Sequence, residues 1–250
     1  TKNWSEAYQL DYNNFWRNPE VEIHHFIGKD ILYFHTLFWP AMLHVADYQA
    51  PKKVHIHGFL TVNGEKMSKS RGTFILAKTY LKHLDPSFLR YYYATKLNAS
   101  MDDMDLNLED FMFKVNSDVV GKLINIGSRL GSILQKNCEG KLASTYDKKV
   151  LNPISGKADQ ISDYYETLDY HKAMRAIMAC ADDVNKYIND AEPWSVIKED
   201  KAKGQVICTT GINGLRLLSI YLKPVIPDIV NQIERFLDID ALTWEDLDTR

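Results

Sequence analysis

The sequence predicts an α/β portion followed by an all-α portion, and two observations lead to this fold class. Residues 21–62 alternate between strand-like and helix-like patterns with glycine-containing turns, a rhythm typical of α/β proteins. After an acidic connector at residues 101–105, apolar residues recur at helical spacing, and short breaks rich in Gly, Pro or Asp separate the stretches. The second portion is therefore expected to be a helix bundle.

Residues 21–46 are expected to form a strand and then a helix. The pattern predicts a strand over residues 21–27 that Gly28 ends, and Asp30 is a candidate N-cap for a helix that reaches about residue 46. Pro40 should kink that helix, because proline lacks a backbone N–H and its ring clashes with the preceding turn. Helical spacing places six residues on one face: Ile31, Phe34, His35, Phe38, Trp39 and Met42.

A second strand is expected over residues 53–62, where apolar residues alternate with His55, His57 and Thr61. Asn63-Gly64 then predicts a tight turn. Farther along, Asp85-Pro86-Ser87 is a start signal for a helix. The helices expected in the second half run from Leu108 to about Lys136 and over residues 157–190, 203–222 and 225–236.

Length and composition limit the functional interpretation. With 250 residues, 45% of them hydrophobic, the chain can bury a large core and hold more than one domain. No stretch resembles a membrane span and the first residues do not resemble a signal peptide, so we expect a cytoplasmic protein with no membrane partner. The net charge of −3 means that a polyanion would have to bind a local basic surface. Cys138, Cys180 and Cys208 are widely spaced, so we expect reduced thiols and no metal site.

The sharpest motif is the loop at residues 63–72, in which Lys66 and Lys69 flank small hydroxyl residues directly after a strand. Lysine ammonium groups suit phosphate oxygens, and their charge matters most where negative charge builds as pyrophosphate leaves. The glycine spacing of a Walker A loop is absent. A basic turn exposed to solvent is the alternative for such a loop when it is considered alone.

The string Lys66-Met67-Ser68-Lys69-Ser70 is identical to a signature of the class I aminoacyl-tRNA synthetases. A chance match to a fixed five-residue string in a chain of this length is on the order of one in ten thousand. The resemblance implies that the loop binds ATP and stabilises the attack of an amino-acid carboxylate on the α-phosphorus. It gives Lys69 the leading catalytic role, with Lys66 and Ser70 in support.

Other runs resemble the methionyl-tRNA synthetases in particular, and together they extend over essentially the whole chain. These runs are residues 25–31, Phe34-His35, Phe38-Trp39-Pro40, residues 89–92, residues 105–111 and Pro193-Trp194. The resemblance implies that the chain holds the C-terminal half of a class I Rossmann-like catalytic domain over residues 1–62. The KMSKS loop and stem-contact region would then occupy residues 63–106, and a helical anticodon-binding domain residues 107–250.

The same resemblance implies the small-molecule sites. Gly28 and Asp30 would meet the ribose of ATP, whereas Asp30 taken alone could simply cap a helix. Methionine would bind against four side chains, Ile31, His35, Phe38 and Trp39. Aromatic walls hold a flexible thioether well, although an aromatic stripe at helical spacing often serves only as core. Phe34 and Met42 are interpreted as core residues, and His55 and His57 as structural.

An RNA-facing surface is expected on the helix that follows Asn107. Lys122, Asn125, Arg129 and Lys136 form a stripe beside an apolar face, a pattern that a solvated helix face also gives. The resemblance implies that Asn125 and Arg129 read anticodon bases and that Trp194 stacks on one of them, which is how unpaired bases are commonly recognised. Without it, Trp194 would be interpreted as a core residue at a helix start.

The other family signature, His-Ile-Gly-His or a close variant, does not occur in this sequence, and neither does a zinc-bearing insertion. The resemblance therefore implies a fragment of a methionine–tRNA ligase whose partners are ATP with bound Mg²⁺, methionine, tRNA(Met) and the missing N-terminal half of the catalytic domain. Alone, the fragment is expected to be inactive. Two alternatives stay open: a stand-alone anticodon-binding module without catalysis, and another class I synthetase such as a cysteinyl or leucyl relative.

Overall fold

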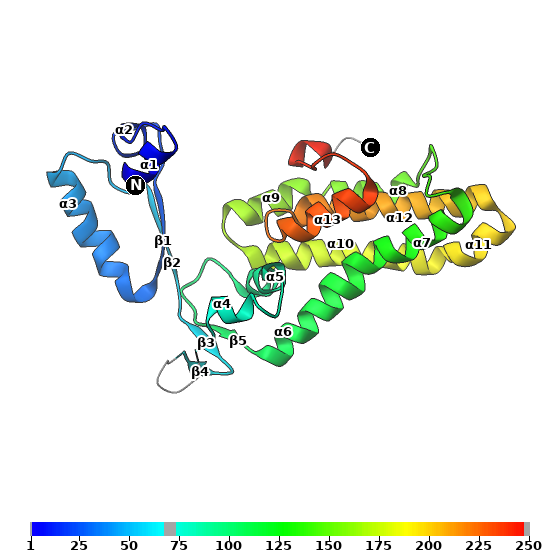
Figure 1. Cartoon of the computed structure of the whole chain (residues 1–250), viewed down its shortest axis with the longest axis horizontal. Helices are drawn as coiled ribbons and strands as arrows, with labels where there is room; N and C mark the ends of the chain where they lie inside the picture. Colours follow the sequence, from blue (N-terminus) through cyan, green and yellow to red (C-terminus); the bar gives the residue numbers. More distant parts are fainter. Residues whose placement is uncertain (1, 68–73, 248–250) are drawn as a thin grey trace. The chain divides into compact units, whose positions relative to one another are not determined.

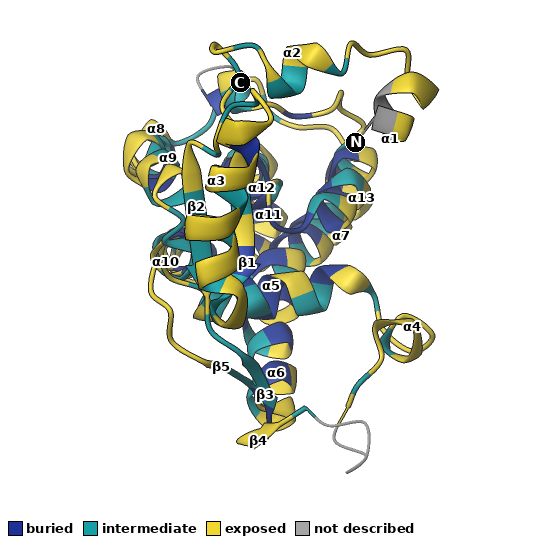
Figure 2. Cartoon of the chain, turned by 90° about the vertical axis from the view of Figure 1, so that its left-hand side faces the viewer, coloured by how far each residue is buried: buried dark blue, intermediate teal, exposed yellow. Residues whose placement is uncertain are grey.

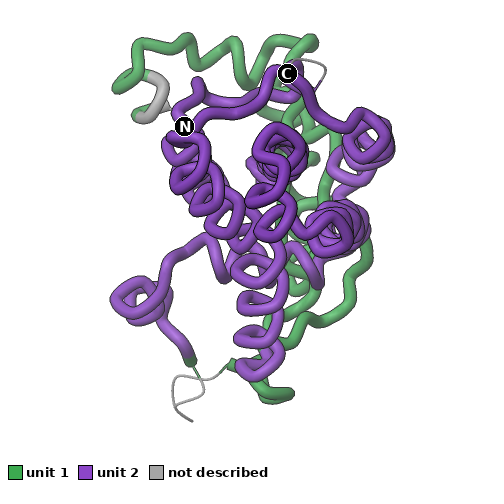
Figure 3. The backbone as a smooth tube through the Cα atoms, turned by 90° about the vertical axis from the view of Figure 1, so that its right-hand side faces the viewer, with its two compact units in different colours: residues 1–74, 99–106 green, residues 75–98, 107–250 purple. Residues whose placement is uncertain are grey.

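The computed structural model describes residues 2–67 and 74–247 and divides the chain into two compact units (Figures 1 and 3). The first unit comprises residues 1–74 and 99–106, and the second comprises residues 75–98 and 107–250. No described helix is long and apolar enough to cross a membrane. The three-part division at residues 62 and 106 stays a prediction.

The first unit contains a two-stranded parallel sheet. Two short helices, α1 (Lys2–Ala7) and α2 (Asn13–Trp16), precede it. Strands β1 (His24–Gly28) and β2 (Lys53–His57) pair in a register that sets Gly28 opposite His57. The expected order of strand, helix and strand is confirmed, and parallel pairing fits an α/β crossover.

The crossover differs from the single helix expected over residues 31–46. It consists of the 3₁₀ helix η1 (Lys29–Ile31), the π-helix η2 (Phe34–Phe38) and the α-helix α3 (Trp39–Val45). Asp30 lies inside η1, so the prediction that it is an N-cap is wrong; Gly28 holds that position. Because Pro40 cannot donate a backbone hydrogen bond, the α-helix begins beside it and the π segment precedes it.

A π-helix has a different periodicity from an α-helix, so the six apolar residues do not form one core face. Phe34 and Met42, which were interpreted as core, are 61% and 62% exposed. The prediction that they are core residues is therefore wrong. By contrast, Leu43 on α3 is buried.

A second, three-stranded sheet completes the first unit. Its strands are β3 (Leu60–Val62), β4 (Glu65–Lys66) and β5 (Met104–Leu106), in the order β4-β3-β5. The single strand expected over residues 53–62 is therefore wrong, because β2 and β3 belong to different sheets. Gly58 separates them at a close approach, where a Cβ would lie 2.2 Å from the backbone oxygen of Asp102. The turn at Asn63-Gly64 is confirmed, with φ angles of 49° and 79°.

Among the described residues of the second unit, every regular element is a helix. In chain order it contains α4 (Ala77–Tyr80), α5 (Pro86–Lys96), α6 (Leu108–Lys114), the π-helix η3 (Val115–Ile124), α7 (Asn125–Cys138), α8 (Lys148–Ser155), α9 (Ala158–Glu166), α10 (Tyr170–Ala191), α11 (Pro193–Glu199), α12 (Lys201–Leu222), α13 (Pro227–Leu237) and the 3₁₀ helix η4 (Trp244–Leu247). The expected bundle is confirmed. Asp85 caps α5 by accepting a hydrogen bond from the Ser87 amide at 2.8 Å.

Helix α12 is the centre of the bundle, since 15 of its 22 residues are buried (Figure 2). It packs against α7, α10 and α11. Glycines permit this close packing: a Cβ at Gly211 would lie 2.3 Å from Cδ1 of Leu130, and one at Gly214 would lie 2.8 Å from Cγ2 of Val184. The apolar face predicted on the helix after Asn107 is confirmed. Four of its five residues, Val115, Val119, Ile126 and Leu130, are buried, and Ile133 is partly buried against the core.

Candidate active-site and nucleic-acid-binding residues

Gly28 and Asp30 lie where the parallel strands of the first unit end. Gly28 is the last residue of β1, and its register partner His57 is the last residue of β2. A Cβ at Gly28 would lie 2.9 Å from Oδ1 of Asp30, so a glycine is needed for that carboxylate to fold back over the strand end. Ligands of open α/β sheets bind at the carboxyl ends of the strands. The geometry is therefore suited to a sugar next to Asp30, because the carboxylate can accept hydrogen bonds from sugar hydroxyls.

The predicted methionine-pocket residues fall on η1, η2 and the start of α3. His35 Nδ1 lies 3.1 Å from the backbone oxygen of Ile31. The ring of His35 meets that of His25 edge-on, with the ring centres 5.5 Å apart. Burial lowers the pKa of His25, and the neighbouring His35 lowers it further. The neutral form of His25 is therefore favoured.

The two predicted aromatic residues of the pocket have different surroundings. Trp39 packs edge-on against Trp16, with ring centres 6.2 Å apart. The ring of Phe38 packs on Phe34 at 5.7 Å and is 61% exposed. An exposed aromatic surface of this kind can bind an apolar side chain or a further segment of protein.

Lys66 lies on strand β4, directly opposite Thr61 of β3. Its ammonium nitrogen is 5.2 Å from the ring centre of Phe59. Lys69 and Ser70, the other predicted phosphate-loop residues, lie outside the described residues. The structure therefore describes the first part of the predicted loop, residues 63–67.

Two carboxylates that sequence reasoning missed hold this region together. Asp103 forms an ion pair with Lys29 at 2.7 Å and accepts a hydrogen bond from the Phe59 amide at 2.7 Å. These contacts lower the pKa of Asp103, with the Lys29 hydrogen bond as the largest cause. Asp105 accepts hydrogen bonds from the Thr61 hydroxyl and the Gly64 amide. The signal in the sequence was the alternation Asp103-Met104-Asp105-Leu106, which is a strand pattern inside an apparent linker.

In the second unit, the structure brings Arg129 and Trp194 together. The guanidinium carbon of Arg129, on α7, lies 5.1 Å from the ring centre of Trp194, the second residue of α11. Arg129 also donates a hydrogen bond from Nη2 to Oδ1 of Asn189, on α10, at 3.2 Å. Trp194 is 37% exposed, so part of its ring can be reached by a ligand. Asn125 is partly buried one turn before Arg129 at the start of α7.

Lys122, the first member of the predicted basic stripe, is engaged within the protein. Its ammonium group pairs with Asp182 of α10 at 2.8 Å and lies 3.8 Å from Asp118. Asp118 is buried and accepts a hydrogen bond from the Tyr91 hydroxyl at 2.9 Å. Burial and this carboxylate raise the pKa of Tyr91 far above its usual range. Lys122 therefore connects η3 to α10 through its ion pairs. Unlike a solvated cation of a basic stripe, it is engaged by carboxylates of the protein itself.

Two family models match consecutive parts of the chain. The first, described as tRNA synthetases class I (M), matches residues 1–131. The chain belongs to this methionyl branch of the class I tRNA synthetases. The second model, described as the anticodon binding domain of methionyl tRNA ligase, matches residues 138–250. The resemblance inferred from the KMSKS string and the surrounding runs is confirmed.

Individual relatives agree with the assignment to the methionyl synthetases. A methionine–tRNA ligase from Thiobacillus denitrificans is 51% identical over 248 residues, which is 97% of this chain and 36% of that relative. The Mycobacterium tuberculosis methionyl-tRNA synthetase in complex with methionyl-adenylate superposes with a TM-score of 0.77 at 27% identity. That match covers 84% of this chain and 43% of the mycobacterial chain. A second structure of the mycobacterial enzyme bound by methionyl-adenylate also gives a TM-score of 0.77, at 26% identity.

These matches confirm the predicted fold class, part of a catalytic domain followed by a helical anticodon-binding domain. The chain spans about a third of the length of the curated relative, at 36%. Among the described residues, no group of three or more His, Cys, Asp or Glu side chains is arranged to hold a metal ion.

Proposed function

We propose that this chain is part of a methionine–tRNA ligase, which activates methionine with ATP and transfers it to the 3′ end of tRNA(Met). The observation that carries the proposal is the order of the two family models, class I tRNA synthetase (M) over residues 1–131 and the anticodon binding domain of methionyl tRNA ligase over residues 138–250. The mycobacterial relative that binds methionyl-adenylate supports an adenylate as the intermediate.

In the first half-reaction, the methionine carboxylate attacks the α-phosphorus of ATP, pyrophosphate leaves and methionyl-adenylate forms. Gly28 and Asp30 would hold the ribose, since the carboxylate at the strand end can accept hydrogen bonds from sugar hydroxyls. Lys66, Lys69 and Ser70 would bind the phosphates and stabilise the charge that builds on the leaving pyrophosphate. Mg²⁺ enters bound to ATP, as part of the substrate.

Methionine would bind against Ile31, His35, Phe38 and Trp39. The aromatic rings favour a thioether through dispersion and sulfur–ring contacts. The ring of His35 is held in place for such a contact, because its Nδ1 lies 3.1 Å from the Ile31 carbonyl oxygen. The exposed surface of Phe38 is available for such a contact.

In the second half-reaction, the methionyl group passes to the terminal adenosine of a tRNA whose anticodon the helical unit reads. Arg129 would donate hydrogen bonds to the edges of anticodon bases, Asn125 would donate or accept them, and Trp194 would stack on one base. The Arg129–Trp194 contact supports this role, because it places a hydrogen-bond donor beside an aromatic platform. Unpaired bases need both kinds of contact.

The chain by itself is expected to be inactive, because the second class I signature is absent from its sequence. The test is methionine-dependent exchange of labelled pyrophosphate into ATP, measured on the full-length protein that carries this sequence and on the 250-residue chain. We expect exchange with methionine by the full-length protein and none by the chain alone. Exchange driven by cysteine or leucine in place of methionine would overturn the substrate assignment.

A further inference from the structure

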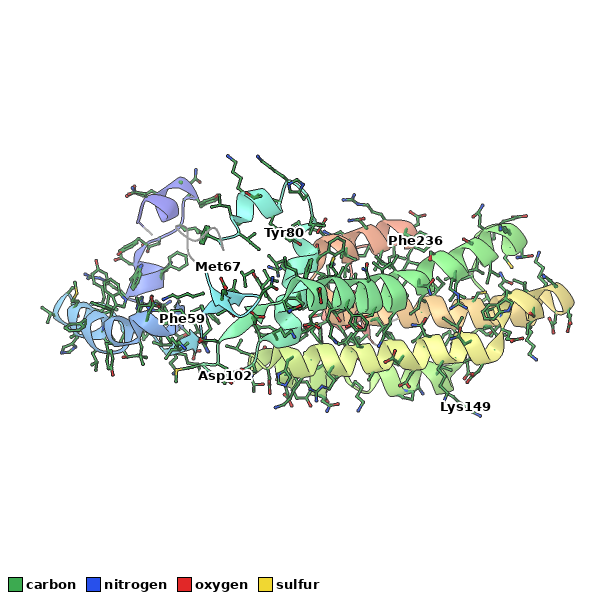
Figure 4. The ribbon with its side chains drawn as sticks, turned by 90° about the horizontal axis from the view of Figure 1, so that it is seen from below. Phe59, Met67, Tyr80, Asp102, Lys149 and Phe236 are labelled. Atoms are coloured by element: carbon green, nitrogen blue, oxygen red, sulfur yellow. The ribbon has the colours of Figure 1, made fainter. Side chains whose placement is uncertain are left out.

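The acidic connector at residues 101–105 has no role in the proposed function, yet it contributes a strand to the first unit. Strand β5 runs parallel to β3, with Asp105 opposite Thr61 in the register. Figure 4 shows the side chains around this small sheet and labels Phe59, Met67 and Asp102. Two acidic side chains of this connector, Asp103 and Asp105, contact the segment and the turn that lead to Lys66.

A single oxygen of Asp105 makes two of these contacts. Oδ1 accepts a hydrogen bond from the Thr61 hydroxyl at 2.7 Å and another from the Gly64 amide at 2.7 Å. Thr61 is the residue directly opposite Lys66 across the β3–β4 pair. The carboxylate therefore fixes both the strand beside Lys66 and the turn that precedes it.

The backbone conformation of the turn at Asn63-Gly64 is restricted by these hydrogen bonds. Asn63 and Gly64 both have positive φ angles, 49° and 79°, as a two-residue hairpin turn requires. The Asn63 amide donates a hydrogen bond to the backbone oxygen of Leu106 at 3.2 Å, which adds a second attachment to β5. With only two residues in β4, the hairpin depends on β5 for its position.

The neighbouring carboxylate links this hairpin to the segment that holds Gly28 and Asp30. Asp103 forms an ion pair with Lys29 and accepts a hydrogen bond from the Phe59 amide. The Phe59 ring lies under two ammonium groups, with Lys29 Nζ at 4.8 Å and Lys66 Nζ at 5.2 Å from its centre. Cations are attracted to the face of an aromatic ring over such distances.

We propose that Asp105 is a positioning residue, which fixes Lys66 relative to the strand ends at Gly28 and Asp30. This inference rests on the proposed function, in which Lys66 meets the phosphates of ATP. Catalytic groups lose much of their effect when they are displaced by about 1 Å, so a residue that fixes the hairpin acts on the rate without touching the substrate.

The test measures methionine-dependent ATP–pyrophosphate exchange by the full-length protein and by three variants. Asp105→Ala removes both hydrogen bonds and is expected to lower kcat by about 10- to 100-fold, with little change in the KM for methionine. Asp105→Asn keeps an acceptor oxygen and should restore most of the rate. Asp102→Ala is the matched control in the same connector: the Asp102 side chain bonds to the exposed Ser100, so kcat should stay within about twofold.

The outcomes separate the inference from the proposed function. If the unsubstituted protein shows no methionine-dependent exchange, the proposed function fails. If it is active and Asp105→Ala matches Asp102→Ala, only the positioning role of Asp105 is overturned. A rise in the KM for methionine equal to the fall in kcat, without recovery in Asp105→Asn, would also overturn it. If Asp105→Ala does not fold, Thr61→Val decides: a fall of about 3- to 10-fold in kcat supports the role, and an unchanged kcat overturns it.

Discussion

The guanidinium group of Arg129 lies over the ring of Trp194, 5.1 Å from its centre, and is held from the side by the amide oxygen of Asn189. Helices α7, α10 and α11 contribute one residue each to this cluster. The arrangement therefore depends on the packing of three helices around α12, and no single helix face contains it.

The first prediction concerns Trp194→Ala, which removes the aromatic platform next to Arg129. We expect the affinity for an anticodon stem-loop bearing CAU to fall by about tenfold or more, because base stacking on an aromatic side chain contributes about 1–3 kcal/mol. A binding titration at fixed moderate salt measures the change. Phe113→Ala is a suitable control, since Phe113 is another exposed aromatic residue of this unit and lies on α6. Equal losses in both variants would show that the ring of Trp194 has no special role.

Tyr91→Phe tests the buried contact between α5 and η3. The substitution removes the hydroxyl that donates to Asp118, a carboxylate that is only 7% exposed. We expect the free energy of unfolding to fall by about 1–3 kcal/mol, because a buried charged acceptor loses one of its donors. Denaturant unfolding measures the change, with Tyr93→Phe as the control on the same helix. A stability equal to that of the control would argue against the contact.

Gly211→Ala tests the close packing of α12 on α7. The new methyl group would lie 2.3 Å from Cδ1 of Leu130 and 3.2 Å from Cδ1 of Ile188. Alanine favours a helix over glycine by about 1 kcal/mol, whereas overpacking a core costs about 1–3 kcal/mol. We therefore expect a net loss of stability in thermal unfolding, while Lys203→Ala at an exposed position of the same helix stays near the parent. An increase in the melting temperature of Gly211→Ala would contradict the packing described above.

The sequence predicted those structural features that are determined by residues close to one another in the chain. The N-cap at Asp85, the turn at Asn63-Gly64 and the apolar face from Val115 to Leu130 all follow from neighbouring residues, and all were predictable. The strand at Met104–Leu106 was missed because it is stabilised by pairing with Leu60–Val62, more than forty positions away in the chain. Gly58 was predicted to lie inside one strand because the cause of the break is also distant in the chain. The backbone of Asp102 approaches Gly58 so closely that a side chain would not fit there.

The candidate sites show the same division. The signature string was enough to propose Lys66, and the family resemblance was enough to propose Arg129 and Trp194. The residues that hold them in place, Asp105 and Asn189, belong to other segments. The alternating pattern around Asp105 indicates a strand, but it does not indicate which residues that carboxylate contacts. The π-helix at Phe34–Phe38 also escaped prediction, because helical spacing alone does not distinguish it from an α-helix.

The pH dependence of stability gives a further prediction at Cys208. Burial raises the pKa of this thiol to about 11, from an ordinary value of 9.0. The folded protein therefore keeps the proton where the unfolded chain loses it, so the stabilising contribution is complete below about pH 9 and is lost as the pH rises towards 11. Urea unfolding across this window should show a steeper fall for the parent than for Cys208→Ala. Parallel curves for the two proteins would be inconsistent with a raised pKa.

The central claim is that the protein carrying this chain attaches methionine to tRNA(Met) and reads its anticodon through the helical unit. The most direct measurement is aminoacylation by the full-length protein, comparing a tRNA(Met) transcript that bears CAU with one whose first anticodon base is changed. We predict methionine attachment with a kcat/KM for the CAU transcript about tenfold or more above that for the altered one, since one well-recognised base contributes about 1–3 kcal/mol. No attachment of methionine to either transcript, or equal use of both, would contradict the account.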